Sequence, residues 1–147
     1  MESALFDVSA VDAVAALVST MKAELDGVPS IAFLHDTTTK NVIVTTTGAF
    51  SGIVDVDDLC FGDPRYPAAL TLAALKAFGG PIDYVDAWLH AANFKNDKLF
   101  RLYVALFVVG FMSEHGKGFN GNPLPSSAEQ RAQLHKVFGD CLRRAAA

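Results

Sequence analysis

A short β-hairpin constrains the fold of this chain more than any other feature of its sequence. Residues 42–45 and 50–56 are short runs rich in β-branched and aromatic side chains, and Thr47-Gly48-Ala49 between them has the composition of a turn. The two open ends of a hairpin lie side by side. We therefore predict a hairpin over residues 42–56 that brings Asn41, before the first strand, close to Asp55 at the end of the second.

Helical patterns fill most of the remaining sequence. Apolar residues recur at helical spacing over residues 8–25, and Asp26-Gly27-Val28-Pro29 is typical of a helix end. The helical pattern resumes after Gly62-Asp63-Pro64 and continues over residues 64–145. The predicted fold class is mainly α with a small β-hairpin (α+β), in a single domain spanning residues 1–147.

Start and stop signals divide this second part into helices. They are expected over residues 64–78, 82–92, 97–114 and 126–144. Asp63 should cap the first of them, with Pro64 at its first position, and Gly79-Gly80-Pro81 should end it. Residues 116–125 have the composition of a loop, and Ser126-Ser127-Ala128-Glu129 has the pattern of a capping box.

Composition argues against several classes of protein. With 51% hydrophobic and 19% charged residues, the chain is not expected to be disordered. A net charge of −4 without clustered Lys and Arg argues against a nucleic-acid surface. The apolar run 102–112 is too short to span a membrane, and the first residues lack the pattern of a secretion signal, so we expect a cytoplasmic protein.

The cysteines and histidines give no metal-site signal. Cys60 and Cys141 lie far apart without a CxxC pattern, which favours two reduced thiols. The histidines show no HxxxH or HExxH spacing, so a zinc site is not expected.

Three oxygen-bearing side chains are expected to converge at the open end of the hairpin. Asp36 and Asn41 bracket a short polar loop before the first strand, and Asp55 follows the second. Carboxylate and amide oxygens suit Mg²⁺, which usually takes one or two carboxylates together with substrate phosphates. Both acids follow apolar runs, from which we expect buried strands that aim them into a site. The alternative is that Asp36 and Asn41 only shape a turn and that the acids from Asp55 onward are solvated.

An ordered series of motifs runs through this region. It consists of Asp36-(four residues)-Asn41-Val42-Ile43-Val44, then Gly52-Ile53-Val54-Asp55, then Phe61-Gly62-Asp63-Pro64. In order and spacing, the series resembles the aminoglycoside phosphotransferase family, small-molecule kinases that share the protein-kinase-like fold. The matching motifs cover residues 34–70, and the later helices are compatible with the family but carry no signature of it.

The resemblance implies roles for individual residues. Asp36 matches the catalytic acid that takes or orients the proton of a substrate hydroxyl, and Asn41 and Asp55 match the ligands of Mg²⁺ that accompanies ATP. Asp57 matches a neighbouring acid with a supporting role, and Asp63 matches a residue of structural importance. The implied activity is transfer of the γ-phosphate of ATP to a hydroxyl of a small molecule. The acidic balance of the chain would suit an aminoglycoside-like acceptor.

Two departures from the family pattern concern the loop itself. His35 stands one place later than the family's histidine, and Leu34 occupies that position. His35 is therefore not expected to orient the loop in the family's manner, and an exposed loop residue is the alternative. Lys40 replaces part of the family's loop and either is solvated or contacts a phosphate.

A third departure concerns the nucleotide. The resemblance implies an N-terminal lobe with a Gly-rich loop and a strand Lys that hold ATP, and the sequence before Asp36 shows neither. The chain is therefore expected to be the C-terminal lobe alone, with the missing N-lobe supplied by a longer gene or another chain. The uncovered face should be apolar and prone to self-association. The alternative functions are a non-catalytic, pseudokinase-like binding module and an inactive truncated fragment.

Overall fold

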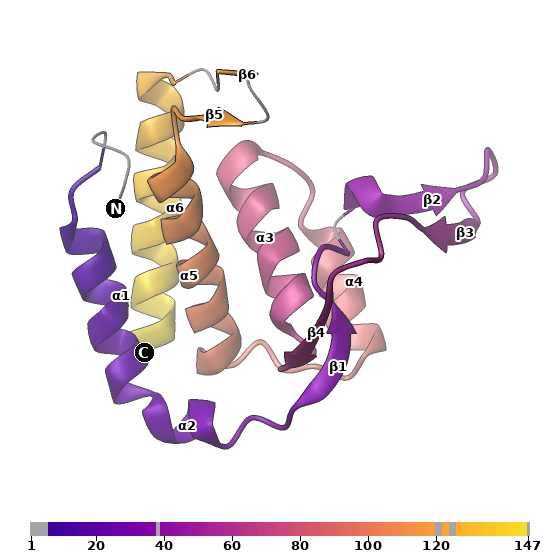
Figure 1. The fold of residues 1–147 in the computed structure, drawn as a ribbon, viewed down its shortest axis with the longest axis horizontal. Coiled ribbons are helices and arrows are strands. Elements are labelled where there is room, and N and C mark those ends of the chain that lie inside the picture. The colour runs from indigo at the N-terminus through magenta and orange to yellow at the C-terminus, as the bar shows by residue number, and fades with distance from the viewer. Residues whose placement is uncertain (1–5, 38, 120–121, 124–125, 147) are drawn as a thin grey trace.

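The fold is mainly helical with small antiparallel strand pairs, which confirms the predicted α+β class. The computed structural model describes residues 6–37, 39–119, 122–123 and 126–146. Four helices lie roughly side by side in Figure 1 and form the body of the molecule: α1 (Ser9–Thr20), α3 (Tyr66–Phe78), α5 (Lys98–Glu114) and α6 (Ala128–Ala146). The central helix α5 packs against both α6 and α3, and α4 (Asp83–Ala91) packs against α3.

The first helical segment is interrupted, although the sequence predicts one helix over residues 8–25. Helix α1 ends at Thr20, and the short helix α2 (Lys22–Asp26) follows. Met21 lies between them with ψ of 17°, outside the helical range, and its side chain is buried in the core. Burial of Met21 therefore accompanies a change of chain direction that helical spacing alone does not reveal.

The later helices follow the predicted ranges closely, and side chains cap two of them. The carboxylate of Asp97 accepts a hydrogen bond from the Phe100 amide at 3.0 Å and caps α5. At α6 the capping oxygen belongs to Ser127, which accepts from the Gln130 amide at 3.0 Å. The predicted pairing of Ser126 with Glu129 is thus wrong by one residue, because Ser126 Oγ instead accepts a hydrogen bond from Arg131.

Helix α3 begins at Tyr66 rather than at Pro64. Asp63 accepts a hydrogen bond from the Arg65 amide at 3.0 Å, so it caps the turn that leads into the helix rather than the helix itself. Gly79, with a φ of 85°, ends α3 as predicted.

Two strand pairs lie between α2 and α3. The predicted hairpin is confirmed as β2 (Val42–Val44) and β3 (Phe50–Ile53), with Gly48 in its turn at a φ of 81°. Strand β3 is shorter than predicted. A second antiparallel pair joins β1 (Ile31–Leu34) to β4 (Leu59–Gly62), so the strands that precede Asp36 and follow Asp55 lie side by side. This second pair was not predicted from the sequence.

A third, very short pair falls in the segment that was predicted to be a loop. Strands β5 (Gly118–Phe119) and β6 (Asn122–Pro123) pair antiparallel between α5 and α6. The loop prediction is therefore wrong for these residues, and the rest of the 116–125 segment lies partly outside the described residues.

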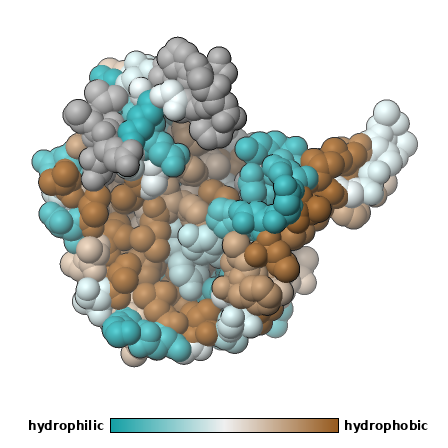
Figure 2. All heavy atoms as spheres, viewed as in Figure 1, coloured by the Kyte–Doolittle hydropathy of each residue, from teal (hydrophilic) through white to brown (hydrophobic). Residues whose placement is uncertain are grey.

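Burial differs sharply between the helices and the strands. The core is formed by side chains from α1, α3, α4, α5 and α6, among which Phe100, Leu102 and Val108 are fully buried. The strands instead carry exposed apolar side chains. In the strands these are Ile31, Ile43, Val44, Phe50, Ile53, Leu59 and Phe61; together with Val54 and Val56, which lie between β3 and β4, they are named here the exposed strand surface. Figure 2 shows hydrophobic residues along the hairpin that projects from the body.

The prediction that Asp36 and Asp55 emerge from buried strands is therefore wrong. The hairpin projects from the helical body in Figure 1, and its apolar side chains remain exposed despite their sequence pattern. Within the described ranges, none of the helices has the length and apolar character needed to cross a bilayer.

Candidate functional site

The candidate site is built around Asn41, which ends the loop between β1 and β2. Its side-chain amide donates a hydrogen bond to the backbone oxygen of Asp36 at 2.7 Å. Its own backbone oxygen accepts a hydrogen bond from the Val54 amide at 2.9 Å. Asn41 is only 7% exposed, so both bonds are protected from water. A single residue thus ties the loop at Asp36 to the end of β3.

Asp55 directly follows this anchored position. Because Val42 pairs with Ile53 and Asn41 bonds to Val54, Asp55 lies at the same end of the hairpin as Asn41, as predicted. Its φ of 59° lies in the left-handed region, which is uncommon for a residue other than glycine. Such conformations persist only where neighbouring structure holds them, and they are concentrated at functional sites.

The chemistry of these groups fits a divalent cation with phosphate ligands. The amide nitrogen of Asn41 is committed to Asp36, which leaves its amide oxygen as the group that a cation could take. Asp36 and Asp55 add carboxylate oxygens from the two segments that Asn41 joins. These are hard oxygen ligands of the kind that Mg²⁺ prefers. Within the described ranges, no group of three or more His, Cys, Asp or Glu side chains is arranged to hold a metal ion.

Lys40 lies on the same side of the loop as the Asp36 carboxylate. Its ammonium nitrogen is 3.9 Å from Asp36 Oδ2, and its side chain is 75% exposed. An ion pair this long and this exposed contributes little to stability. The Lys40 side chain is therefore mostly in solvent, at the edge of the Asp36 carboxylate.

His35 is half-buried, so the alternative that it is an exposed loop residue is wrong. Its backbone amide donates to the Asp58 oxygen at 3.0 Å, and its Nδ1 lies 3.2 Å from Asp58 Oδ2. Its ring also lies 5.7 Å from the ring of Tyr66 and 6.3 Å from that of Phe107, measured between centroids. His35 thus anchors the start of the loop to the segment before β4 and to the helical body. No local pattern distinguishes Asp58 from its acidic neighbours, so this contact was not predicted.

A buried ion-pair network holds the other end of this region. Asp63 receives hydrogen bonds from the Arg65 guanidinium, at 2.6 Å for Nη2, and from the Tyr103 hydroxyl at 3.1 Å. Arg65 also donates to Asp97 at 2.8 Å, so the residue after β4 is tied to the start of α5. Burial opposes ionisation of Asp63, but the hydrogen bonds from Arg65 hold its pKa below the usual range. Asp63 is structural, as the sequence predicted, although its partners were not foreseen.

The remaining predicted residue, Asp57, is not drawn into the site. Like the side chain of Asp55, that of Asp57 is exposed and has no hydrogen bond or ion pair in the described part of the chain, but Asp57 lies further from the position that Asn41 anchors. Its position therefore does not support the predicted supporting role of Asp57.

A groove beside the loop was not predicted. It has a volume of about 580 Å³ and lies between the β2–β3 hairpin and α4. Its walls are mainly apolar and include Phe50, Tyr84 and Trp88, and Thr37 contributes from the loop, next to Asp36. The Thr37 hydroxyl is buried and has no hydrogen-bond partner among the described residues. Such a group favours a ligand that can accept or donate a hydrogen bond there.

Asp36, Asn41 and Asp55 are therefore brought to one end of the hairpin, His35 and Lys40 flank them, and Asp57 stands apart. Comparisons with protein-family models, with curated proteins and with solved structures found no match to this chain.

Proposed function

We propose that this chain is the catalytic lobe of an ATP-dependent phosphotransferase that acts on a hydroxyl group of a small molecule. The observation that carries the proposal is the position of Asn41. Its two hydrogen bonds join the loop of Asp36 to the residue before Asp55. They favour a catalytic loop over two unrelated polar turns. The ordered motifs over residues 34–70 provide the second line of support.

In the proposed reaction the acceptor hydroxyl oxygen attacks the γ-phosphorus of ATP. The bond to the bridging oxygen breaks, ADP leaves, and Asp36 takes the hydroxyl proton. Asn41 and Asp55 would hold Mg²⁺, which when bound would neutralise charge on the phosphates. Lys40 would exchange its long contact with Asp36 for a contact with a phosphate oxygen.

The apolar groove next to Thr37 supports a particular kind of acceptor. Its aromatic walls would receive an apolar or aromatic portion of the substrate, and its opening at the loop would bring a hydroxyl toward Asp36. This favours acceptors with an apolar body over the polycationic aminoglycosides that the net charge of the chain suggested.

The exposed strand surface supports a second lobe or chain as partner. We propose that this partner binds the adenine base and the α- and β-phosphates of ATP. It would also cover the apolar side chains of β2, β3 and β4. Self-association through the same surface is expected when the partner is absent.

The proposal is tested by calorimetric titration of Mg·ATP into the wild-type chain and into Asp55→Asn. Asn tolerates the left-handed backbone at this position, so the variant removes the charge without disturbing the fold. We expect weak binding in the wild type, with a dissociation constant of about 1 mM, and none in the variant. Asp12→Asn, at an exposed acid of α1, is the matched control and should bind like the wild type. Equal binding by Asp55→Asn would refute the metal site.

A non-catalytic binding module is the second candidate, and the exposed strand surface favours it. The phosphotransferase requires the negative charge of Asp36, whereas a non-catalytic binding module does not. The binding module would be favoured if the wild-type chain and the double variant Asp36→Asn, Asp55→Asn captured the same partner equally well. Neither chain should then bind nucleotide.

A further inference from the structure

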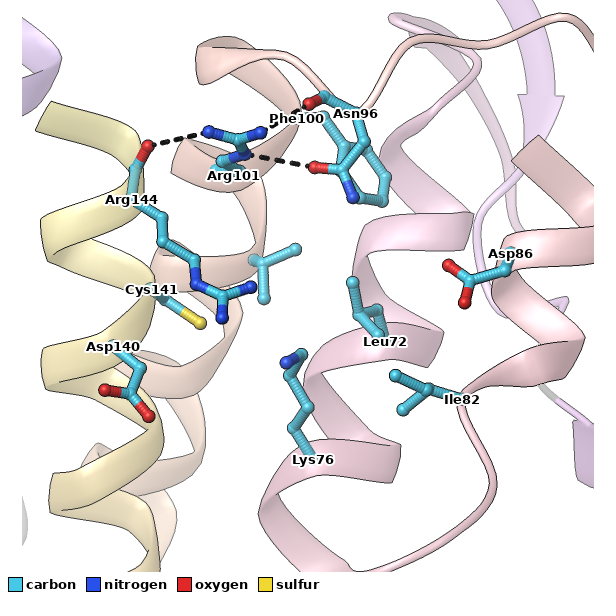
Figure 3. Close-up of a pocket in the computed structure, with 11 residues that line it drawn as sticks. Leu72, Lys76, Ile82, Asp86, Asn96, Phe100, Arg101, Asp140, Cys141 and Arg144 are labelled. Atoms are coloured by element: carbon cyan, nitrogen blue, oxygen red, sulfur yellow. Dashed lines mark hydrogen bonds between the residues drawn. The ribbon is translucent and has the colours of Figure 1, made fainter. Parts of the chain in front are cut away.

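A second cavity lies among the helices and is lined by residues that the proposed function does not use. Its volume is about 390 Å³, and it is enclosed by α3, α5, α6 and the first part of α4. Asp36, Asn41 and Asp55 are not among its lining residues. Figure 3 shows the side chains of Lys76, from α3, and Arg144, from α6, extending into the same space in front of Cys141.

Positive charge dominates one side of this cavity. Lys76, Arg101 and Arg144 line it, in a chain whose net charge is −4. Arg101 is held in place because it donates to Asn96 Oδ1 at 3.1 Å, to the Asn96 backbone oxygen at 3.0 Å and to the Arg144 backbone oxygen at 3.2 Å. It is therefore a fixed positive charge at the end of α6.

Lys76 and Arg144 differ from Arg101 because their charged groups have no protein partner. In the described part of the chain, neither the Lys76 ammonium nor the Arg144 guanidinium makes a hydrogen bond or an ion pair. Both act electrostatically on the Cys141 thiol: burial raises its pKa, the positive charges of Lys76 and Arg144 oppose the rise, and the negative charge of Asp140 adds to it. Two positive charges that act on the same atom, neither of them in an ion pair among the described residues, repel each other.

The carboxylates of the cavity do not neutralise this pair. Asp140 also lines the cavity, but its carboxylate is already engaged in an ion pair with Arg143. Asp86 lies across the cavity on α4. Leu72, Phe100 and Val104 supply apolar wall between these charged groups.

We propose that this cavity binds a small organic phosphate, with the phosphate group between Lys76 and Arg144 and an apolar body against Leu72 and Phe100. Guanidinium and ammonium groups are the side chains best suited to phosphate oxygens, and a phosphate would remove the repulsion between them. The volume suits a ligand of one or two rings. The site is independent of the Asp36 loop.

The test uses phenyl phosphate as the probe and follows backbone amide shifts by NMR in the full chain. We expect saturable binding in the wild type, with the largest shifts at Lys76, Cys141 and Arg144. Lys76→Met and Arg144→Gln should each weaken binding at least about tenfold. Lys136→Met, which removes an exposed lysine of α6 outside this cavity, is the matched control and should bind like the wild type.

A thiol-labelling experiment provides a second readout on the same molecule. Phenyl phosphate should slow alkylation of Cys141, which lines the cavity, and leave the rate at Cys60, on β4, unchanged. Melting temperatures should be unchanged or raised in Lys76→Met and Arg144→Gln, because each removes one of two repelling charges. Absence of saturation at about 10 mM phenyl phosphate, or equal affinity in the two cavity variants, would overturn the site. Equally tight binding of inorganic phosphate would overturn the assignment of an organic ligand.

Discussion

The helical body and the strand region of this molecule use similar apolar side chains in opposite ways. Leu102 on α5 is 0% exposed, whereas Leu59 on β4 is 58% exposed. The helices therefore gain most of their stability from a shared core, and the strands hold their shape through backbone pairing and a few polar anchors. The helical body thus buries its apolar side chains within itself, whereas the strand region leaves its own exposed, which is the basis for the partner proposed above.

Truncating one leucine in each region tests this difference most strongly. Leu102→Ala should lower the free energy of unfolding by about 2–5 kcal/mol, because it leaves a cavity in a fully buried site. Leu59→Ala should change it by less than about 0.5 kcal/mol. Urea denaturation monitored by circular dichroism measures both values. A large loss in Leu59→Ala would mean that the strands are packed like a core.

The ion pairs of Asp63, Arg65 and Asp97 connect the strand region to the helical body, so removing the charge of Asp63 should weaken this connection. Asp63→Asn should cost about 3 kcal/mol, since it leaves the buried Arg65 guanidinium with only Asp97 as a charged partner. Hydrogen exchange should then show faster exchange in β4 and at the start of α5 than in α6. Uniform exchange after the substitution would contradict a joining role.

The same network predicts how stability depends on pH. The pKa of Asp63 is lowered in the folded chain, so its contribution is present above the unfolded pKa of about 4 and is lost as the pH falls through the folded value. Acid titration of wild type and Asp63→Asn should therefore converge at low pH. Parallel curves across the acid range would show that Asp63 is not the titrating group.

A smaller effect is expected at the backbone of Asp55. Asp55→Ala should cost about 1 kcal/mol, because alanine tolerates a φ of 59° poorly, whereas Asp55→Asn should be close to neutral. Thermal melts of the two variants at equal concentration provide the comparison. Equal stability of the two variants would mean that the left-handed conformation is not held in solution.

The smallest effect on stability, and the most specific one, concerns the exposed strand surface. Phe50 is 68% exposed, so Phe50→Ser should leave the unfolding free energy nearly unchanged. Self-association and hydrophobic-dye binding should both fall, because an exposed aromatic side chain is lost. Analytical ultracentrifugation measures the first. A monomeric wild type that binds no dye would contradict an interactive strand surface.

Local signals predicted much of this fold. Helical periodicity and the Gly and Pro residues that end helices located most helices to within a few residues, and β-branched runs around Gly48 located the hairpin. The neighbourhood of Asn41 and Asp55 followed from hairpin geometry, because both residues are adjacent to paired strand ends. These features depend on short sequence separations, which propensity and spacing describe well.

Features that depend on tertiary packing were not predicted. The β1–β4 pair joins residues far apart in sequence, and Leu59–Gly62 has no alternating pattern to mark it as a strand. Exposure of the strands could not be inferred from the apolar runs themselves, which have the same pattern whether or not a partner covers them; only the expected absence of an N-lobe predicted an uncovered apolar face. The cavity between Lys76 and Arg144 depends on how α3 packs beside α6, which no local spacing encodes.

The central claim is that Asp36, Asn41 and Asp55 form one site for metal-bound phosphates. Paramagnetic broadening by Mn²⁺ in the presence of ATP, measured on backbone amides, tests it most directly because it detects weak binding. We expect selective broadening of the amide signals of Asp36, Asn41 and Asp55 in the wild type. This broadening should disappear in the Asp55→Asn variant. Broadening centred on other acids, or unchanged by Asp55→Asn, would contradict it.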